Sequence, residues 1–536
     1  MAKVPTPVNE PVLAYAPGSP ERAALKAALE AAAGERPEIP IVIGGDAIES
    51  GRTVDVVMPH AHGHVLATAH EASGEHVTRA IEVAMEARRS WSRTPFEDRA
   101  AIFLRAAELL TTTWRQRINA ACMLGQSKTC FQSEIDAVCE LADFWRFNVA
   151  FAERIYAEQP ISPRGQWNRV DHRPLEGFVL AVTPFNFLSI AANLPTAPIL
   201  MGNVALWKPS STSLLGCWEM MRLLKEAGLP DGVLSLLPGA GPEQGAAALA
   251  SEHLAGVHFT GSTGTFKALW RGISDGLDRY RTFPRLVGET GGKDFIVAHE
   301  SADPQALVTA ITRGAFEYQG QKCSAASRIY VPQAMWARVR DGVAADLETI
   351  RFGDVRDFTC FGGAVIDERA YERIAGYVKL GRDTAKVVAG GACDDAEGYF
   401  VHPTVIEVDD PKHRLMQEEI FGPVATVYPY SQPFADVLAL ADATSPYALT
   451  GAIFANDREA VREAEDALRD AAGNFYVNDK PTGAVVGQQP FGGARQSGTN
   501  DKAGMHLNLL RWVSPRSIKE NLAPPHDYRY SFLDEA

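Results

Sequence analysis

The stretch from Gly177 to Trp207, GFVLAVTPFNFLSIAANLPTAPILMGNVALW, contains no charged residue over 31 positions. Its length alone would allow it to span a lipid bilayer. Six residues oppose a membrane helix, because they break helices or carry amides into lipid: Pro184, Asn186, Asn193, Pro195, Pro198 and Asn203. We therefore predict a buried strand, a turn, a helix and a second buried strand.

Short apolar runs continue after this stretch and alternate with helical segments. GVLSLLPG and GVHFTGS come first, and a second series begins near residue 294 with DFIVAH, SRIYVPQ, ATVYPY and TGAIFA. This alternation is typical of βα units around a parallel sheet. Residues 20–34 and 74–158 carry Ala, Glu, Leu and Arg at helical spacing. The predicted fold class is α/β, with two α/β domains.

Composition narrows the class of ligand. The chain has 536 residues, too many for one compact core of usual size, and 46% of them are hydrophobic. Its net charge of −14 disfavours nucleic acid and anionic membranes as partners. We expect a small-molecule ligand.

The seven cysteines indicate the compartment. They are sparse, form no CxxC pair, and follow a start, MAKVPTPVNE, that lacks signal or transit character. We predict free thiols in a reducing, cytoplasmic setting and no metal site.

Two glycine-containing turns are candidates for binding phosphate. GAGPEQG at 239–245 departs from the dinucleotide fingerprint GxGxxG by one residue in its last interval. FTGSTGTF at 259–266 stands at a strand-to-helix turn, where backbone N–H groups and Ser262 could face a phosphate. An ordinary βα turn explains either one equally well.

Cys323 lies in EYQGQKCSA, residues 317–325, between a predicted helix and a predicted strand. Buried free cysteine is common as a small apolar residue, so packing is one interpretation. The polar neighbours Gln321, Lys322 and Ser324 instead indicate an accessible turn at the end of an element, where sites are built. We expect Lys322 to be a loop charge with no direct role.

Glu289 and Asn186 also end predicted apolar strands. Glu289 precedes Thr-Gly-Gly, which lets backbone approach a ligand closely, and a half-buried carboxylate with a raised pKa would suit a general base. A solvated edge residue is the alternative. Asn186 in TPFNF is a buried amide that needs a partner, and a developing oxyanion is one such partner.

The ordered motifs TPFNF, WKPSS, FTGSTGTF, ETGGKD, GQKCSA and EEIFGPV resemble the aldehyde dehydrogenase superfamily over essentially the whole chain. Two further stretches, VNEPVLAYAPGSPER and TGAVVGQQPFGGARQSGTNDKAG, are similar to its branch that oxidises L-glutamate γ-semialdehyde to L-glutamate in proline breakdown. The resemblance implies an NAD-dependent enzyme with a Rossmann-like cofactor domain, an α/β catalytic domain and a small β oligomerisation flap.

By this resemblance Cys323 is the nucleophile that attacks the aldehyde carbon. Asn186 and the Cys323 backbone N–H meet the oxyanion. The nicotinamide is then reduced, which leaves a thioester, and Glu289 draws a proton from the water that hydrolyses it.

The resemblance also implies a substrate pocket. Ser324 and backbone N–H groups near Gly483 and Ala484 would hold the α-carboxylate. Some relatives have serine where this chain has Ala484, so one side-chain donor is missing here. Phe187 and Phe491 would flank the methylenes, although core packing explains each nearly as well. Glu140 would face the amino group, with a helix-surface carboxylate as the alternative.

The implied cofactor residues follow predicted strands, outside whose carboxyl ends ligands bind. They are Thr183, Lys208, Gly261, Ser262, Thr263, Gly264 and Thr265 along the adenosine and pyrophosphate, and Glu419 and Phe421 at the nicotinamide ribose and ring. Ser211 stands where strict NAD enzymes of the superfamily often carry glutamate, so NADP is not excluded.

Three other functions remain open. A different semialdehyde dehydrogenase, for example one for succinate semialdehyde, is disfavoured by the loop GQQPFGGARQSGTND. A CoA-acylating relative would lack the general-base glutamate, and Glu289 is present. A non-catalytic protein that retains the fold is disfavoured because all the reactive groups stand at matching positions.

The implied domains are 20–155 with 177–289 for NAD, 290–488 for catalysis, and 156–176 with 505–536 as oligomerisation flap and tail. Prolines and polar alternation in AEQPISPRGQWNRVDHRPLEG favour an exposed hairpin. We expect at least a homodimer, and a transient contact with a proline dehydrogenase is an open possibility.

Overall fold

The uncharged stretch forms β7 (Phe178–Val182), α7 (Leu188–Leu200) and β8 (Val204–Lys208) in a computed structural model that describes residues 3–533. The predicted order of strand, turn, helix and strand is confirmed. β7 and β8 are parallel neighbours with Phe178 opposite Val204. Among the residues described, no helix is both long and apolar enough to cross a membrane.

β7 and β8 lie at the centre of the first sheet, whose strand order is β11-β10-β7-β8-β9-β2-β3. The five strands β11 to β9 run parallel, and β2 and β3 run antiparallel to their neighbours. The other bounds are β2 Ile41–Ile43, β3 Asp46–Ile48, β9 Leu234–Leu236, β10 Leu254–Thr260 and β11 Arg285–Glu289.

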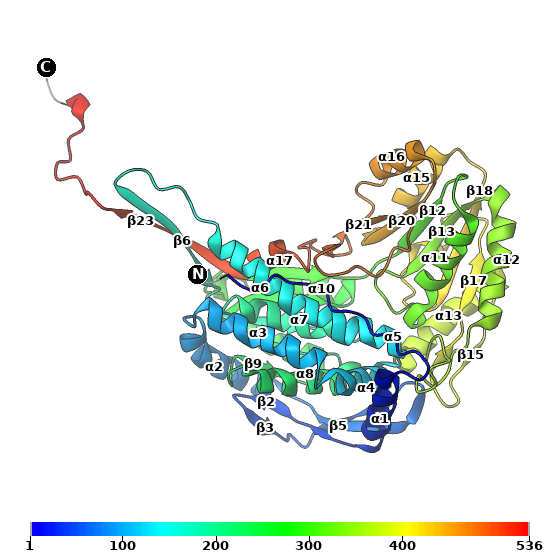
Figure 1. The fold of residues 1–536 in the computed structure, drawn as a ribbon, viewed down its shortest axis with the longest axis horizontal. Coiled ribbons are helices and arrows are strands. Elements are labelled where there is room, and N and C mark those ends of the chain that lie inside the picture. Colours follow the sequence, from blue (N-terminus) through cyan, green and yellow to red (C-terminus); the bar gives the residue numbers. More distant parts are fainter. Residues whose placement is uncertain (1–2, 534–536) are drawn as a thin grey trace.

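Helices cover both faces of this sheet (Figure 1). They are α2 Gly74–Trp91, α3 Phe96–Thr111, α4 Arg115–Gln126, α6 Leu141–Ala157, α8 Leu214–Ala227, α9 Gly241–Ala250 and α10 Thr263–Asp275. Between α4 and α6 the chain forms a short helix, α5 (Cys130–Ser133), and a π-helical segment, η1 (Glu134–Glu140). The π segment was not predicted, because its sequence has ordinary helical spacing.

The second sheet has the order β14-β17-β18-β13-β12-β20-β21, and only β14 is antiparallel. Its strands are β12 Asp294–Ala298, β13 Ala326–Pro332, β14 Lys386–Ala389, β17 Thr404–Glu407, β18 Val424–Tyr430, β20 Thr450–Phe454 and β21 Asn474–Val477. Separate apolar cores lie on its two faces, so each sheet has its own interior. The helices around it are α11 Pro304–Phe316, α12 Gln333–Thr349, α13 Glu368–Thr384, α14 Arg414–Gln417, α15 Phe434–Ala443 and α16 Arg458–Ala467.

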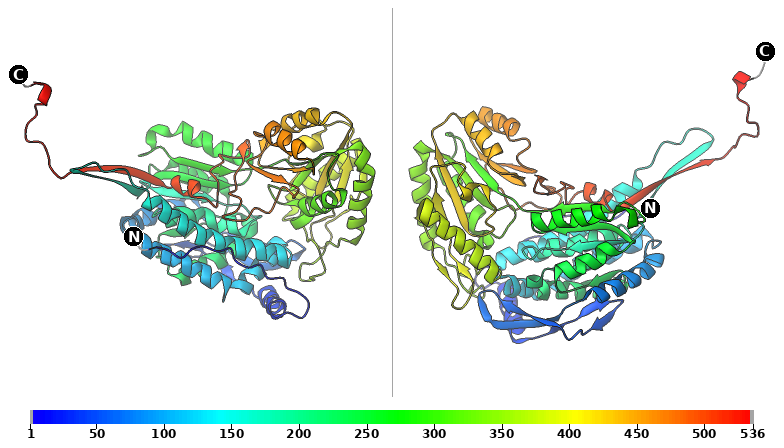
Figure 2. Two further views of the ribbon diagram at one scale, coloured as in Figure 1. Left: turned by 45° about the horizontal axis from the view of Figure 1, so that its top comes forward. Right: turned by 180° about the vertical axis from the view of Figure 1, so that it is seen from behind.

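A two-stranded ribbon projects from the body beside the first sheet (Figure 2). It pairs β6 (Gln166–Pro174) with β23 (Val513–Asn521) in antiparallel register. The hairpin expected within 156–176 is therefore wrong, because β6 finds its partner near the C-terminus. The predicted flap and tail thus form one element, and residues 534–536 of that tail lie outside the described residues.

Smaller elements complete the chain. β1 (Glu38–Ile39), β5 (Ala61–His70) and β4 (Thr53–Met58) form a three-stranded sheet next to α1 (Pro20–Gly34). The extended N-terminal segment runs along the helices of the first domain (Figure 1). The remaining elements are η2 Ser211–Ser213, η3 Leu277–Arg279, η4 Glu317–Gly320, β15 Cys393–Asp394, β16 Phe400–Val401, β19 Tyr447–Ala448, β22 Ala494–Arg495, α17 His506–Leu510 and η5 Ser531–Leu533.

Candidate active site

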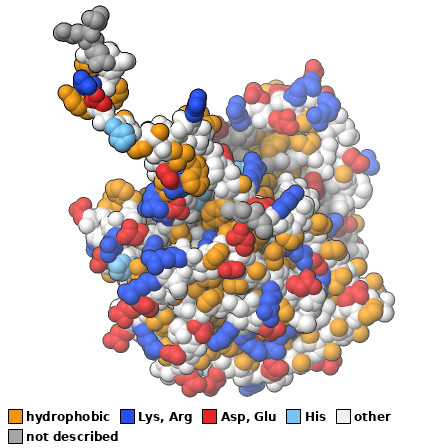
Figure 3. All heavy atoms as spheres, turned by 60° about the vertical axis from the view of Figure 1, so that its left-hand side comes forward, with side chains coloured by type: hydrophobic (Ala, Val, Ile, Leu, Met, Phe, Trp, Pro, Cys, Tyr) orange, Lys and Arg blue, Asp and Glu red, His pale blue; other side chains and the backbone are white. Residues whose placement is uncertain are grey.

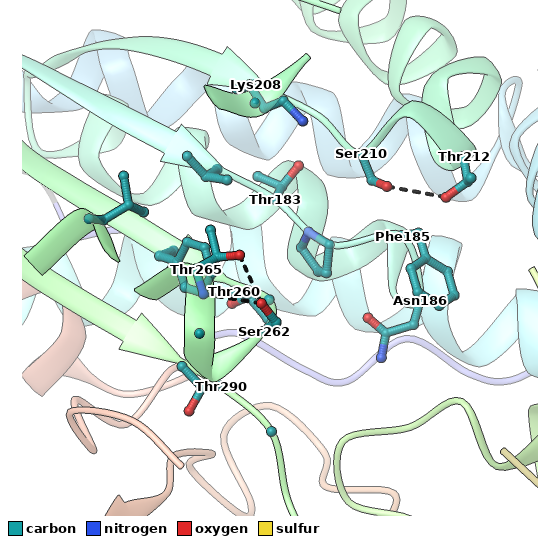
Figure 4. Close-up of a pocket in the computed structure, with 18 of the residues that line it drawn as sticks. Thr183, Phe185, Asn186, Lys208, Ser210, Thr212, Thr260, Ser262, Thr265 and Thr290 are labelled. Carbon is teal, nitrogen blue, oxygen red and sulfur yellow. Dashed lines mark hydrogen bonds between the residues drawn. The ribbon is translucent and has the colours of Figure 1, made fainter. Parts of the chain in front are cut away.

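A cleft of about 1030 Å³ opens where the carboxyl ends of β7, β8 and β10 meet residues of the second sheet (Figure 4). Ten residues predicted from the sequence line it: Thr183, Asn186, Lys208, Gly261, Ser262, Gly264, Thr265, Cys323, Glu419 and Phe421. Ligands bind outside the carboxyl ends of parallel strands, so the location agrees with the fold.

Cys323 lies in the turn between η4 and β13, with its side chain half-buried. The backbone there is tightly packed, since a Cβ on Gly292 would come within 2.2 Å of the Cys323 carbonyl oxygen. Burial raises the pKa of the Cys323 thiol well above its usual value, and the carboxylates of Asp294, Glu289 and Glu419 raise it further. The thiol is thus placed at the cleft but needs help to ionise.

Asn186 lies in the turn after β7, four residues beyond the strand end at Val182, and is almost fully buried. Its Nδ2 donates a hydrogen bond of 3.0 Å to the carbonyl of Gln321, two residues before Cys323. The side-chain amide has a second N–H group, which is free to meet an oxyanion at the thiol. The first sheet therefore supplies an amide donor to the turn that carries the nucleophile.

Glu289 is the last residue of β11. Its carboxylate accepts a hydrogen bond of 3.2 Å from the N–H of Gly493, in the Gly-rich loop. Burial raises the pKa of Glu289 well above its usual value. A carboxylate held in this way binds protons more tightly than one in water, which suits a proton acceptor near neutral pH.

Several predicted substrate residues are not among those that line the cleft. The Ser324 hydroxyl lies 2.8 Å from the hydroxyl of Thr482, next to Gly483 and Ala484. Gly483 has φ +93°, a backbone conformation that glycine adopts without strain. Phe187 is half-buried at the start of α7, and Phe491 is half-buried in the Gly-rich loop.

Glu140 ends the π segment, and its carboxyl group lies 2.8 Å from Ser189 Oγ. Burial, together with the nearby charge of Asp136, raises its pKa to about 8. An exposed helix-surface carboxylate is therefore not the right description.

Lys322 was expected to be a loop charge, and this is wrong. Its side chain is buried, and its ammonium pairs with Glu317 at 3.2 Å. Burial lowers the pKa of Lys322, although the Glu317 carboxylate opposes that shift. The polar residues Gln321, Lys322 and Ser324 are buried, and their hydrogen bonds and ion pairs hold the turn that carries Cys323.

The cofactor residues line the long part of the cleft. Ser262 caps α10 by accepting from the N–H of Thr265 at 3.2 Å, and its neighbour Thr263 begins that helix. Lys208 ends β8 and is half-buried, and burial lowers its pKa. Thr183 Oγ1 accepts from Trp207 Nε1 at 2.9 Å.

At the thiol end, Glu419 accepts from the N–H of Gly292 at 2.9 Å. The Phe421 ring meets the Phe185 ring edge to face, at 5.9 Å between centroids. Both residues thus belong to the end of the cleft that Cys323 lines.

Sequence reasoning missed other lining residues. They include Phe185, Ser210, Thr212, Thr290, Ile366, Asp367, Arg369 and Arg373. The last four come from the start of α13, in a stretch with no recognisable motif. Asp367 caps α13 by accepting from the N–H of Ala370, so the sequence signal for a helix start was available there.

One group of possible metal ligands lies elsewhere. Glu38, Glu49 and His70 have ligand atoms within 4.8 Å of one another. The N–H of Gly51 donates to His70 Nδ1 at 3.4 Å, which leaves the ring proton on Nε2, the nitrogen nearest Glu38. That tautomer has no lone pair for a metal, so these residues do not support a metal site.

Comparisons with known proteins agree along the whole chain. The aldehyde dehydrogenase family profile matches residues 47–518. The chain is 48% identical over 538 residues to "Delta-1-pyrroline-5-carboxylate dehydrogenase, mitochondrial" of Dictyostelium discoideum, covering 99% of this chain and 96% of that one. The Homo sapiens protein of the same name is also 48% identical, covering 98% and 94%.

Solved structures give the same result. The Delta-pyrroline-5-carboxylate dehydrogenase from Mycobacterium tuberculosis superposes with a TM-score of 0.97 at 53% identity, covering 100% of this chain and 99% of that one. Its structure bound with NAD superposes with a TM-score of 0.96, at the same identity and coverage. The expected fold is confirmed.

The comparisons correct the expected cytoplasmic location. The relatives from Dictyostelium discoideum, Mus musculus and Homo sapiens are all named as mitochondrial proteins. The argument from free thiols failed because a reducing environment is not unique to the cytoplasm.

We predict that alkylation of Cys323 by iodoacetamide accelerates as pH rises through the alkaline range, because the raised pKa delays thiolate formation. Asp294→Asn removes a negative charge near the thiol and should move the profile to lower pH. Peptide mass spectrometry can follow Cys323 separately, with the buried Cys360 as an internal control. Identical profiles for wild type and Asp294→Asn would contradict this electrostatic account.

Proposed function

The chain belongs to the aldehyde dehydrogenase family, and we propose that it oxidises L-glutamate γ-semialdehyde, the open form of Δ1-pyrroline-5-carboxylate, to L-glutamate with NAD. One observation carries the chemistry. The Cys323 thiol and the Asn186 amide lie at the end of a cleft whose other walls come from the strand ends of the first sheet. The similarity of the whole chain to relatives named for this activity supports the substrate.

In the first step the Cys323 thiolate attacks the aldehyde carbon and the carbonyl electron pair moves to oxygen. The free N–H of Asn186 and the backbone N–H of Cys323 donate to that oxygen. Donors fixed before the reaction stabilise the developing charge without further rearrangement. Bound NAD would supply the two-electron oxidant. The C–H bond of the tetrahedral carbon breaks with loss of its electron pair, the C=O bond re-forms, and a thioester on Cys323 remains.

Glu289 then acts in hydrolysis. Its carboxylate takes a proton from water as the water oxygen attacks the thioester carbon, and the C–S bond breaks to release the thiolate. The raised pKa makes Glu289 a stronger base than an exposed glutamate. The Gly493 N–H holds one carboxylate oxygen and so fixes the orientation of the other.

The cleft has suitable groups for NAD along its length. Lys208 is a cationic donor at a strand end, as Figure 4 shows, and the turn 261–265 offers backbone N–H groups at the start of α10. A Cβ on Gly245 or Gly264 would meet open space, which agrees with a ligand lying over both. Glu419 and Phe421 are proposed to hold the ribose and ring nearest Cys323.

We assign the substrate's polar groups to the other side of the turn. Ser324, Gly483 and Ala484 are proposed to bind the α-carboxylate, and Phe187 and Phe491 to flank the methylenes. Glu140 is proposed to bind the amino group. Because its pKa is about 8, its carboxylate form and so its attraction for an ammonium group increase as pH rises through that value.

The β6–β23 ribbon and the tail after it are proposed to pair with a second copy of the chain. Figure 3 shows orange side chains on the projecting part of the molecule at its upper left. The large apolar side chains exposed on the ribbon and tail are Trp167, Leu522, Tyr528, Tyr530, Phe532 and Leu533, and Ile161 is exposed in the loop before β6. An exposed set of this kind favours a protein interface. Contact with a proline dehydrogenase stays a prediction.

Wild-type protein should produce NADH at 340 nm from Δ1-pyrroline-5-carboxylate, and Cys323→Ala should lose at least about 1000-fold of that rate, since no other group can form the thioester. Cys360→Ala, a buried thiol outside the cleft, is the matched control and should retain activity. NADP and succinate semialdehyde should be poorer. A higher rate with succinate semialdehyde would remove the substrate assignment and leave the thiol mechanism standing.

Glu289→Gln should separate the two halves of the reaction. NADH should form in a rapid burst of about one equivalent per active site, followed by a steady rate at least about 100-fold slower than wild type, because the thioester lacks its general base. Stopped-flow absorbance measures both phases. If added CoA raises wild-type turnover above its rate without CoA, the protein is a CoA-acylating enzyme and the proposed hydrolytic function is wrong.

Removing residues 513–536, which include β23, should abolish the oligomer. Light scattering coupled to gel filtration should give a multiple of 58.1 kDa for the full chain and a smaller species for the truncated one. Trp167→Glu in β6 is a milder variant that leaves the strand pairing in place. A monomeric full-length protein would contradict the proposed role of the ribbon.

A further inference from the structure

A buried ion pair lies between the elements that carry Asn186 and Cys323. Lys128 Nζ is 2.5 Å from Asp136 Oδ2, and both side chains are about 1% exposed. Taking two charges out of water costs free energy that is recovered only when further hydrogen bonds satisfy both groups. The contacts of each partner therefore identify what the pair holds.

Asp136 holds the start of α7. Its carboxylate accepts from the backbone N–H groups of Leu188 and Ser189, both at 3.0 Å, and from Ser189 Oγ at 2.6 Å. α7 has no capping side chain of its own, because Phe187 occupies the cap position. Asp136 supplies that cap from another element, and its charge matches the positive end of the helix dipole. The helix it fixes begins two residues after Asn186.

Lys128 contacts one aromatic ring from each side of the site. Its ammonium lies 4.6 Å from the centroid of the Phe187 ring and 4.4 Å from that of the Tyr318 ring. Phe187 adjoins Asn186, and Tyr318 begins the turn that leads to Cys323. Both distances lie within the range of a cation–π contact, which is strongest where water is excluded.

The residues just before Lys128 also link the segment that carries Asn186 to the turn that carries Cys323. The Gln126 side chain donates to the carbonyl of Phe185, next to Asn186. The Gln319 side chain donates to the carbonyl of Ser127 at 2.9 Å. Ser127 has φ +55°, so the chain turns sharply after α4 and presents three consecutive residues to both catalytic elements.

We propose that Lys128 and Asp136 are positioning residues that hold the Asn186 amide in register with Cys323 during oxyanion formation. The proposal rests on the proposed function, since it requires Cys323 as nucleophile and Asn186 as donor. The pair acts through α7, through the Phe187 ring and through the turn at Tyr318. Its loss should therefore lower kcat while leaving NAD binding, which uses the other end of the cleft, unchanged.

The main test separates stability from catalysis with Lys128→Met and the double variant Lys128→Met/Asp136→Asn. The single variant leaves a buried unpaired carboxylate and should lower Tm, whereas the double variant removes both charges and should recover most of that loss. We expect kcat with Δ1-pyrroline-5-carboxylate to fall at least about tenfold in both, with the Kd for NAD within about twofold of wild type. A double variant with wild-type kcat overturns the proposal.

Two matched variants keep the test decisive if the double variant does not fold. Tyr318→Phe keeps the ring and removes a buried hydroxyl that has no hydrogen-bond partner among residues 3–533, so kcat should stay within about twofold. Tyr318→Leu removes the ring and should lower kcat about tenfold. Equal kcat values for the two variants would overturn the proposal.

Glu219→Gln is the control for loss of an ion pair on a buried carboxylate as such. Glu219 is buried and pairs with Arg117 at 2.6 Å and with Arg222 at 3.2 Å, two half-exposed side chains, and none of its side-chain hydrogen bonds within residues 3–533 reaches Phe187 or Tyr318. It should lower Tm and leave kcat unchanged, and a tenfold fall in its kcat would overturn the specific role of Lys128 and Asp136. A wild-type protein that does not turn over Δ1-pyrroline-5-carboxylate would count against the proposed function instead.

Discussion

The hydrogen bond from Asn186 to the carbonyl of Gln321 joins the two domains beside the nucleophile, Cys323. Each sheet has its own core, so neither needs the other to fill its interior. The oxyanion donor comes from the first sheet and the nucleophile from the second. A displacement of the two sheets by about 1 Å would cost much of the benefit of a fixed donor. The contacts around this bond are therefore the ones on which catalysis depends.

Close backbone packing serves the same end. Gly291 lies so near Glu419 that a Cβ would come within 2.5 Å of its carboxylate, and Gly292 is pressed against the carbonyl of Cys323. Larger residues at either position would push Glu419 or the nucleophile turn out of place. The two glycines after Glu289 and Thr290 thus bring the end of β11 into the second domain without a long linker.

The sequence predicted the strands well because buried parallel strands have a simple signature of short apolar runs before a turn. Lys208 and Glu289 end such strands, Asn186 follows one, and Cys323 lies in the turn before one, and the resemblance of the motifs around them supplied their roles. The pairing of β6 with β23 could not be predicted, since nothing in the sequence of either strand indicates which other strand it pairs with. The prediction for Lys322 was wrong for a related reason. A lysine in a polar stretch gives no sign that it will be buried in an ion pair with Glu317. The π segment was missed because its sequence has ordinary helical spacing. The cap residue Asp367 marks a helix start, but no motif shows that the residues there line the cleft.

The late position of the completing segments has a consequence for synthesis on the ribosome. Asn203 Nδ2 donates to the carbonyl of Trp512, which lies 309 residues later in the chain. The pairing of β6 with β23 joins residues that are separated by a similar length of chain. Gly493, which orients Glu289, also comes from the last part of the chain. Contacts of such high sequence separation form slowly and only after both partners have emerged. A nascent chain can thus hold Cys323 and Glu289 long before it holds the Gly493 N–H that orients Glu289, so the complete site forms only near the end of translation.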